Sequence, residues 1–190
     1  MGSSVDRRVR RSRQLSWQAL VGLILEKGYD RITVQDIIDR ADIGRSTFYA
    51  HFTDKDDLLL SGLEEFGAAF EDNLKQHFAT RGDPSPALPV FQHAYENRDV
   101  YRALAGNRGG EVLRDGLRRQ VSEAMAHHLG EVIPVGDPAL PSEVTVEFLI
   151  SSLLGLLAWW LDSDMPYAPE QMADMYMKLA LQGVPAAYGI

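Results

Sequence analysis

The segment GYDRITVQDIIDRADIGRSTFYAHFTDKDDL, residues 28–58, decides the fold of this chain. Thr33 is a good helix N-cap, and the apolar positions after it recur at helical spacing. These apolar positions are Val34, Ile37, Ile38 and Ala41. A tight turn is expected over residues 42–44, followed by a shorter helix over residues 45–52. Two short helices joined by a three-residue turn form a helix-turn-helix, whose second helix can enter the major groove of DNA.

The second helix has an inward face and an outward face. Phe48 and Phe52 lie four residues apart, so both can point into the subunit and fix the angle of the helix. The side chains predicted to face DNA are Arg45, Ser46, Thr47, Tyr49 and His51. Arg45 can bind guanine O6 and N7 through two hydrogen bonds, worth about 1–3 kcal/mol of discrimination. Ser46 and Thr47 can reach base edges or thymine methyl groups.

Other polar residues are predicted to contact phosphates, which set the register of a complex without conveying sequence. Tyr49, His51 and Lys55 are assigned to this role. Thr33, together with backbone amides at the start of its helix, can hold another phosphate. Arg10 and Arg13 extend the same contact from the preceding helix. A solvated polar face is the alternative for all of these residues.

This stretch resembles the tetracycline-repressor (TetR) family. The matching residues are Glu26-Lys27-Gly28-Tyr29, Thr33-Val34-x-Asp36-Ile37, Ala41-x-Ile43, Thr47-Phe48-Tyr49-x-His51-Phe52 and Lys55-x-x-Leu58. Three positions depart from the usual pattern: Asp42 replaces a turn glycine, Gly44 replaces a capping Ser or Thr, and Ala50 replaces a larger residue. Asp tolerates the left-handed backbone and Gly is an acceptable N-cap, so the geometry is expected to persist.

The resemblance implies an all-α homodimer that binds a palindromic operator in double-stranded DNA. Its recognition helices would lie about 34–36 Å apart, in successive major grooves. A small apolar or aromatic effector would bind the C-terminal domain and move the helix that follows residue 54. The spacing of the recognition helices would then change and the operator would be released. Repression is the expected mode, with activation as the alternative.

The charge distribution agrees with a DNA-binding N-terminus. The net charge is −8, but residues 1–55 carry +3 and residues 56–190 carry −11. Five arginines occur close together: Arg7, Arg8, Arg10, Arg11 and Arg13. A small basic module attached to an acidic body suits a polyanionic partner. The same arginines could also form a solvated tail.

Composition and motifs argue against several other classes of protein. The chain has no cysteine, which excludes disulfides and thiolate metal sites and fits a cytoplasmic protein. The apolar run at residues 15–25 has no cleavage site after it, so a signal peptide is not expected. No nucleophile elbow or Gly-rich phosphate loop is present, and an enzyme is not expected. His127 and His128 diverge on a helix, and His93 with Glu96 lacks a third ligand, so neither a metal nor a cofactor is predicted.

Helical periodicity over almost the whole chain predicts about nine helices in two domains. Residues 1–54 would be the helix-turn-helix domain, and residues 55–190 a helical effector-binding and dimerisation domain. Beyond the helix-turn-helix, helices are expected over 10–27, 55–76, 87–97, 99–105, 109–131, 142–161 and 169–182. The uncharged run 148–161 is 14 residues long, too short to span a bilayer, and no membrane association is expected.

The last two helices are the predicted dimer interface, because helix 142–161 is apolar on nearly all sides and needs cover all round. The predicted interface residues are Leu149, Leu153, Leu156, Trp160, Met172, Met175, Tyr176 and Leu179. Two such helices from each subunit can form a four-helix interface. An intramolecular core is the alternative.

The middle helices are the predicted effector pocket. The candidate lining residues are Phe66, Phe70, Phe91, His93, Tyr95, Tyr101, Leu104, Met125 and Trp159. His93 and Tyr95 would supply polar contacts, and ordinary core packing is the alternative for each residue. A second functional class also stays open, in which the chain is a ligand-binding or protein-interaction module whose helix-turn-helix no longer binds DNA.

Overall fold

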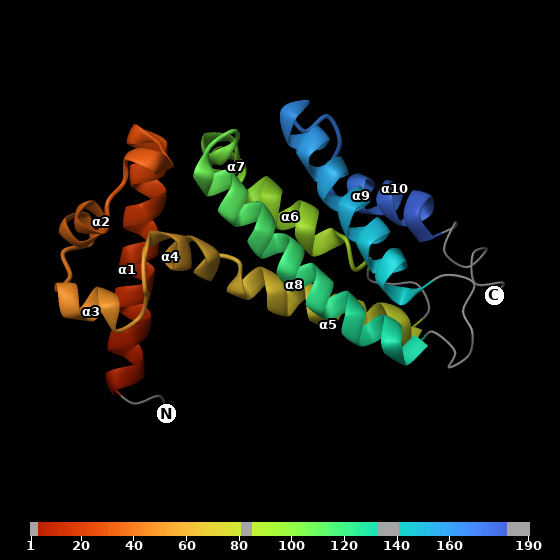
Figure 1. Cartoon of the computed structure of the whole chain (residues 1–190), viewed down its shortest axis with the longest axis horizontal. Coiled ribbons are helices and arrows are strands. Elements are labelled where there is room, and N and C mark those ends of the chain that lie inside the picture. Colours follow the sequence, from red (N-terminus) through yellow and green to blue (C-terminus); the bar gives the residue numbers. More distant parts are fainter. Residues whose placement is uncertain (1–3, 81–84, 133–140, 182–190) are drawn as a thin grey trace. The chain divides into compact units, whose positions relative to one another are not determined.

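The computed structural model describes residues 4–80, 85–132 and 141–181, and these residues form ten α-helices and one 3-10 helix. The first part contains α1 (Ser4–Lys27), η1 (Tyr29–Arg31), α2 (Val34–Ala41), α3 (Arg45–Tyr49), α4 (Lys55–Ser61) and α5 (Glu64–Thr80). The second part contains α6 (Leu88–Glu96), α7 (Arg98–Leu104), α8 (Arg108–Val132), α9 (Ser142–Asp162) and α10 (Pro169–Leu181). Since the described residues form no strand, the prediction of an all-α fold is confirmed (Figure 1).

The chain divides into two compact units. The first contains residues Met1–Glu64 together with Asp99–Leu113, and the second contains Glu65–Arg98 and Arg114–Ile190. This division differs from the predicted boundary between residues 54 and 55. The helix-turn-helix unit takes in all of α4 and also a segment from the middle of the chain.

In the first unit, α2, α3 and α4 pack against α1 (Figure 1). The side chains at the centre of this packing are fully buried: Leu20, Ile24, Tyr29, Ile37, Phe48 and Leu58. α1 ends at Gly28, whose backbone has φ 74° and ψ 149°. This region of backbone conformation is open almost only to glycine, so Gly28 allows the chain to turn from α1 into η1.

The expected single helix over residues 55–76 is wrong, because α4 ends at Ser61 and α5 begins at Glu64. Gly62 is the C-cap of α4 and lies directly beneath the indole of Trp17. A Cβ at residue 62 would lie only 2.2 Å from the Trp17 ring, so the close approach of α1 requires glycine here. Glycine also weakens a helix interior, which favours the interruption at this point.

In the second unit, α10 packs on α6 and on α9. Phe91 of α6 and Trp160 of α9 are fully buried and meet edge to face, with ring centroids 5.5 Å apart. The Tyr176 hydroxyl of α10 donates a hydrogen bond of 2.7 Å to the Leu149 carbonyl of α9. Burial raises the pKa of Tyr176 to about 12, so this donor stays protonated at neutral pH.

α9 is longer than the uncharged run in the sequence indicates. The stretch Glu143–Asp162 has 20 residues and is long and apolar enough, by length and composition only, to cross a membrane, whereas the uncharged run 148–161 within it has 14 residues. A core helix of a soluble protein passes the same test. In the second unit, one side of α9 is buried at Leu149, Leu153 and Trp160, as in a helix that packs within a protein.

Candidate nucleic-acid interface

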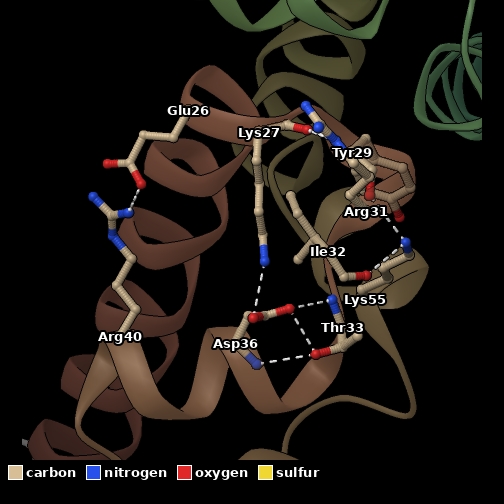
Figure 2. Close-up of polar contacts among 9 residues, drawn as sticks. All are labelled: Glu26, Lys27, Tyr29, Arg31, Ile32, Thr33, Asp36, Arg40 and Lys55. Atoms are coloured by element: carbon tan, nitrogen blue, oxygen red, sulfur yellow. Dashed lines mark hydrogen bonds and ion pairs between the residues drawn. The ribbon is translucent and has the colours of Figure 1, made fainter.

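The helix-turn-helix begins with a fully formed capping box at α2. The Asp36 backbone N–H donates to the Thr33 hydroxyl at 3.2 Å, and the Thr33 N–H donates to the Asp36 carboxylate at 2.7 Å. The Thr33 hydroxyl also donates to that carboxylate at 2.6 Å. These contacts, shown in Figure 2, satisfy amide groups at the helix start that have no intrahelical partner.

Two ion pairs hold α2 against the last turn of α1 (Figure 2). Lys27 lies 2.9 Å from Asp36, and Arg40 pairs with Glu26. The Lys27 and Thr33 contacts hold the pKa of Asp36 well below its usual range, and Arg40 lowers the pKa of Glu26. The Arg40 guanidinium lies over Gly22, where a Cβ would be 2.8 Å from its Nη2 atom. The angle between the first two helices is therefore set by charge as well as by apolar packing.

The turn between α2 and α3 has the geometry expected despite its unusual residues. Asp42 has φ 51° and ψ 49°, the left-handed conformation in which glycine is most comfortable. Gly44 caps α3 with an extended backbone and without a side-chain hydrogen bond. The expected geometry is therefore present at Asp42 and Gly44, two of the three departures from the TetR pattern.

α3 presents two faces, as the two phenylalanines predict. Phe48 is fully buried and Phe52 is 3% exposed, and their ring centroids are 5.6 Å apart. Tyr49 is 47% exposed, and the Arg45 guanidinium lies 5.6 Å from the centre of its ring. Arg45 and Ser46 are exposed and Thr47 is half-buried. The outward face of α3 therefore carries one guanidinium, two hydroxyl side chains and one phenol.

The structure places Lys55 in a different role from the predicted phosphate contact. Its ammonium donates hydrogen bonds to the backbone carbonyls of Tyr29 (3.0 Å) and Ile32 (2.9 Å), as Figure 2 shows. The same ammonium lies 4.4 Å from the centre of the Tyr29 ring. Two of its three donors are thus used by backbone carbonyls at the start and the end of η1, and the Tyr29 carbonyl also accepts the Ile32 N–H.

Two further predicted phosphate ligands also have internal partners. Arg13 pairs with Glu64, and its guanidinium lies 5.2 Å from the centre of the Phe52 ring. The Thr33 hydroxyl is used by the capping box, beside the ionised Asp36. The carboxylates of Glu64 and Asp36, next to Arg13 and Thr33, would repel a phosphate bound at these residues. The assignments of Arg13 and Thr33 are therefore revised to structural roles.

His51 and Arg10 remain available in the first unit. The Nε2 atom of His51 lies 3.2 Å from the Ser12 hydroxyl of α1, which joins the end of the recognition segment to α1. His51 keeps a half-buried ring, and Arg10 is exposed. Both residues belong to the first unit.

A contact that the sequence did not predict joins the segment Asp99–Leu113 to the helix-turn-helix. The Tyr29 hydroxyl donates to Asp56, which also accepts a hydrogen bond of 2.9 Å from Arg108. Burial disfavours ionisation of Asp56, but these two hydrogen bonds outweigh it and keep its pKa below the ordinary value. Gly109 lies against the Tyr29 ring, where a Cβ would be 2.7 Å from Cγ. The signal in the sequence was the Gly109-Gly110 pair, since glycine has no Cβ and permits a close approach.

The predicted pocket residues are not brought together as one set. Phe70 and Phe91 are buried in the second unit, and Tyr95 stacks on Trp160 with ring centroids 6.4 Å apart. Trp159 is 47% exposed and Tyr95 is 43% exposed. Tyr101 and Leu104 belong to the first unit, so they do not line a pocket within the second. His93 and Met125 are half-buried, and the side chain of Phe66 lies outside the described residues.

Most of the predicted dimer residues lie inside the second unit. Five of them are 5% exposed or less: Leu149, Leu153, Trp160, Met172 and Tyr176. Leu156 and Met175 are half-buried, and Leu179 is 77% exposed. The buried five form core contacts, so the alternative interpretation holds for them and they are corrected to core residues.

The exposed apolar surface of the second unit includes Leu179 from the predicted dimer set and three side chains that were not in that set. Val144, Phe148, Trp159 and Leu179 are each at least 47% exposed.

Within the described residues, no group of three His, Asp or Glu side chains could hold a metal ion. The side chains of His127 and His128 lie outside that description.

Comparisons with known proteins agree with this arrangement. Residues 18–61 match the family model for bacterial regulatory proteins of the tetR family, and residues 86–182 match the model for a transcriptional regulator C-terminal region. The uncharacterized HTH-type transcriptional regulator YxbF of Bacillus subtilis (strain 168) is 23% identical over 180 residues. The alignment covers 92% of this chain and 46% of YxbF, so the chain spans about half the length of that relative.

Solved structures show the same fold. A putative TetR-family regulator from Syntrophomonas wolfei superposes with a TM-score of 0.64 at 18% identity, covering 94% of this chain and 95% of the other. The transcriptional regulator FadR from Bacillus subtilis, in complex with stearoyl-CoA, superposes with a TM-score of 0.59 at 14% identity. That alignment covers 90% of this chain and 98% of FadR.

Proposed function

The chain belongs to the tetR family of bacterial regulatory proteins, and on that premise we propose that it is a homodimeric, cytoplasmic transcription regulator that binds operator DNA. The observation that carries the proposal is the division of α3 into a buried face and a polar face. Phe48 is fully buried, whereas Arg45 and Tyr49 are exposed beside it. A helix fixed by its inner aromatic ring presents its outer side chains in one orientation, as recognition in a major groove requires.

Arg45 is the residue we assign to base recognition. Its guanidinium is exposed and lies over the Tyr49 ring, which restricts its orientation before DNA binds. A guanidinium presented in this way can donate two hydrogen bonds to guanine. Ser46 and Thr47 lie on the same short helix, where their hydroxyl groups can contact neighbouring base edges. Tyr49 and His51 are assigned to phosphates flanking them.

The direct test is selection of bound sequences from a random DNA pool with the purified protein. We expect a palindrome with half-sites about one helical turn apart, or a multiple of that distance. Arg45→Ala should then lower discrimination against the wrong base by roughly 10-fold or more, corresponding to about 1–3 kcal/mol. Arg119→Ala, an exposed arginine of α8 in the second unit, is the matched control. Failure to enrich any sequence would favour an interaction module with an inactive helix-turn-helix.

We assign dimerisation to the exposed side of α9 and α10. Exposed residues of α9 recur at alternating spacings of four and three: Val144, Phe148, Ser151, Gly155 and Ala158. This is the spacing of a helix-packing seam, and its small residues permit close approach of a second helix. Leu179 of α10 is the most exposed large apolar side chain given for the described residues, and we assign it to the same interface. The occupant we propose is a second copy of this chain, since a palindromic operator needs two identical modules.

Sedimentation equilibrium tests this assignment. Leu179 is 77% exposed, so Leu179→Glu leaves the folded subunit intact while placing a charge in the proposed interface. We expect the variant to dissociate to monomers at concentrations where the wild type is dimeric. Leu25→Glu, at a 53% exposed leucine of α1, is the control for added charge and should stay dimeric. A dimeric Leu179→Glu protein would contradict the assignment.

A small apolar or aromatic molecule is the effector class we propose for the second unit, with repression as the mode of action. Phe91, Tyr95 and Trp160 supply an aromatic cluster there. FadR, which shares this fold, was solved in complex with stearoyl-CoA. Stearoyl-CoA added during a DNA titration is therefore a first probe, with Trp fluorescence as the readout of binding. We expect an effector to weaken DNA binding by roughly 5–150-fold. Bound ligands that never change DNA affinity would contradict a ligand switch.

A further inference from the structure

α8 is shared between the two compact units. The segment Asp99–Leu113 belongs to the first unit, and residues 108–113 of that segment are the start of α8. α8 then continues as one α-helix to Val132, and its residues from Arg114 onward belong to the second unit. A single continuous helix therefore contributes residues to the helix-turn-helix unit and to the unit assigned to the effector.

The connection through α4 and α5 is interrupted instead. α4 ends at Ser61 and α5 begins at Glu64, and the second unit starts at Glu65. Gly62 and Leu63, between the two helices, are in a turn. Residues at the end of an element can absorb a displacement through a change in their backbone dihedral angles, whereas a continuous helix carries it along its length. α8 is thus better suited than α4 and α5 to transmit a movement between the units.

The start of α8 is held against the helix-turn-helix by both polar and apolar contacts. Asp56 accepts hydrogen bonds from the Tyr29 hydroxyl and, at 2.9 Å, from the Arg108 guanidinium. Gly109 is buried against the fully buried Tyr29 ring, where a Cβ would be 2.7 Å from Cγ. We name Tyr29, Asp56 and Arg108 the Asp56 network.

The Asp56 network is connected to the start of α2. Lys55, the residue before Asp56, donates hydrogen bonds to the carbonyls of Tyr29 and Ile32, as Figure 2 shows. Ile32 directly precedes Thr33, the N-cap of α2. A displacement of Tyr29 or Asp56 is therefore passed to the residues at which α2 begins, and α2 leads through a tight turn into α3.

The charge of Asp56 depends on the same contacts. Its side chain is only 23% exposed, whereas that of Arg108 is 68% exposed. An ionised carboxylate in a partly buried position needs hydrogen-bond donors to offset the loss of water. Separation of α8 from η1 would remove the Arg108 donor and the Gly109 packing together. The contact is therefore stable with α8 in place and weakened as soon as α8 moves away.

We propose that Asp56 and Arg108 are positioning residues for DNA binding, which couple the first turn of α8 to the start of α2 and hence to α3. This inference rests on the proposed function and concerns its regulation. It assigns to α8 the movement that was expected of the helix after residue 54. An effector bound in the second unit would act by displacing α8, which breaks the Asp56 network and changes the orientation of α3.

Reciprocity gives a test that needs no effector. If the position of α8 controls DNA binding, bound DNA must stabilise the start of α8 by the same free energy. Hydrogen exchange of the full-length protein, followed by mass spectrometry, measures this stabilisation in peptides from residues 99–113. We expect the selected operator to slow exchange there by roughly 5-fold or more in the wild type.

Two substitutions break the network, and a third is the matched control. Arg108→Gln and Asp56→Asn should each reduce this slowing by roughly 2–5-fold, the range for a partly exposed ion pair. Combined, they should cause no more loss than the more severe of the two, because both remove the same contact. Arg108→Lys keeps the charge and should restore part of the slowing. Arg114→Gln, at an exposed arginine of α8 in the second unit, should leave it unchanged.

The DNA affinities of the same proteins separate positioning from loss of a phosphate contact. We expect Arg108→Gln to lower operator affinity by roughly 2–5-fold and to leave the affinity for a scrambled duplex unchanged, because orientation of α3 matters only for base recognition. The slope of log affinity against log salt should keep its wild-type value, since no phosphate contact is lost. Circular dichroism confirms that each variant keeps the helical content of the wild type.

Three results would overturn the inference. If operator binds the wild type without slowing exchange over residues 99–113, the coupling does not exist and the proposed function stands. The same conclusion follows if Arg108→Gln slows as the wild type does, or if Arg114→Gln loses as much as Arg108→Gln. If the wild type prefers no duplex sequence over a scrambled one, the proposed function fails, and the coupling to operator binding fails with it.

Discussion

Phe48→Ala tests the physical basis of the proposed interface most directly. The Phe48 ring is fully buried and lies 5.4 Å from the centre of the Tyr49 ring and 5.6 Å from that of Phe52. Removing a buried phenylalanine costs about 3–5 kcal/mol, which includes the lost aromatic contacts. This is a large part of the about 5–15 kcal/mol that stabilises a typical domain. α3 has only five residues and cannot form as an isolated helix, so it should lose its position first.

Tyr49→Ala is the matched variant, since Tyr49 is the next residue and is 47% exposed. We expect urea denaturation followed by circular dichroism to show a loss of several kcal/mol for Phe48→Ala and less than about 1 kcal/mol for Tyr49→Ala. DNA affinity should fall in both proteins, in Tyr49→Ala without a loss of folding. All measurements use one protein concentration, because the proposed dimerisation would make stability depend on concentration. Equal destabilisation by the two substitutions would refute the division of α3 into inner and outer faces.

Three further substitutions test individual features of the first unit. The Cβ added by Gly28→Ala would have no neighbour within 4 Å, but φ at this residue is 74°. Backbone strain alone should therefore lower the free energy of unfolding by about 1–3 kcal/mol, as measured by urea denaturation. Gly109→Ala should cost about 1–3 kcal/mol in the same measurement, because its Cβ would lie 2.7 Å from Tyr29 Cγ; no change would mean that this packing does not form. Asp36→Asn removes a carboxylate whose pKa is lowered, chiefly by Lys27. That stabilisation is present above about pH 4 and is lost as the pH falls, so the midpoints of wild type and variant should differ at pH 7 and converge toward pH 2.

The positions of the helices could be predicted from the sequence because local signals agree with one another. Thr33 gives the start of α2, and Gly28 and Pro169 mark an end and a start that the structure reproduces. The inward direction of Phe48 and Phe52 follows from their spacing alone. The prediction of a TetR-family regulator is confirmed by the two family models that match the chain. These signals act over a few residues, which is why sequence patterns are enough for them.

The roles of individual charged side chains could not be predicted in the same way. Lys55 and Arg13 lie beside the recognition segment in the sequence, but their partners are the Tyr29 and Ile32 carbonyls and Glu64. Those partners come from elsewhere in the chain, and periodicity carries no information about them. The sequence gives the number of cations near α3, whereas the tertiary contacts decide which of them remain available for DNA.

The proposed dimer surface illustrates the same limit for apolar residues. α9 is apolar on nearly all sides, so its periodicity does not distinguish the side that packs inward from the side that stays exposed. Trp159 and Trp160 are neighbours, yet the first is 47% exposed and the second is fully buried, because successive helical residues diverge by about 100°. α10 packs on α9, and Phe91 of α6 contacts Trp160. This packing places Trp160 in the core. The residues of α9 that a partner could contact are therefore those that intramolecular packing leaves exposed. They include small residues such as Gly155, which a search for the most apolar positions overlooks.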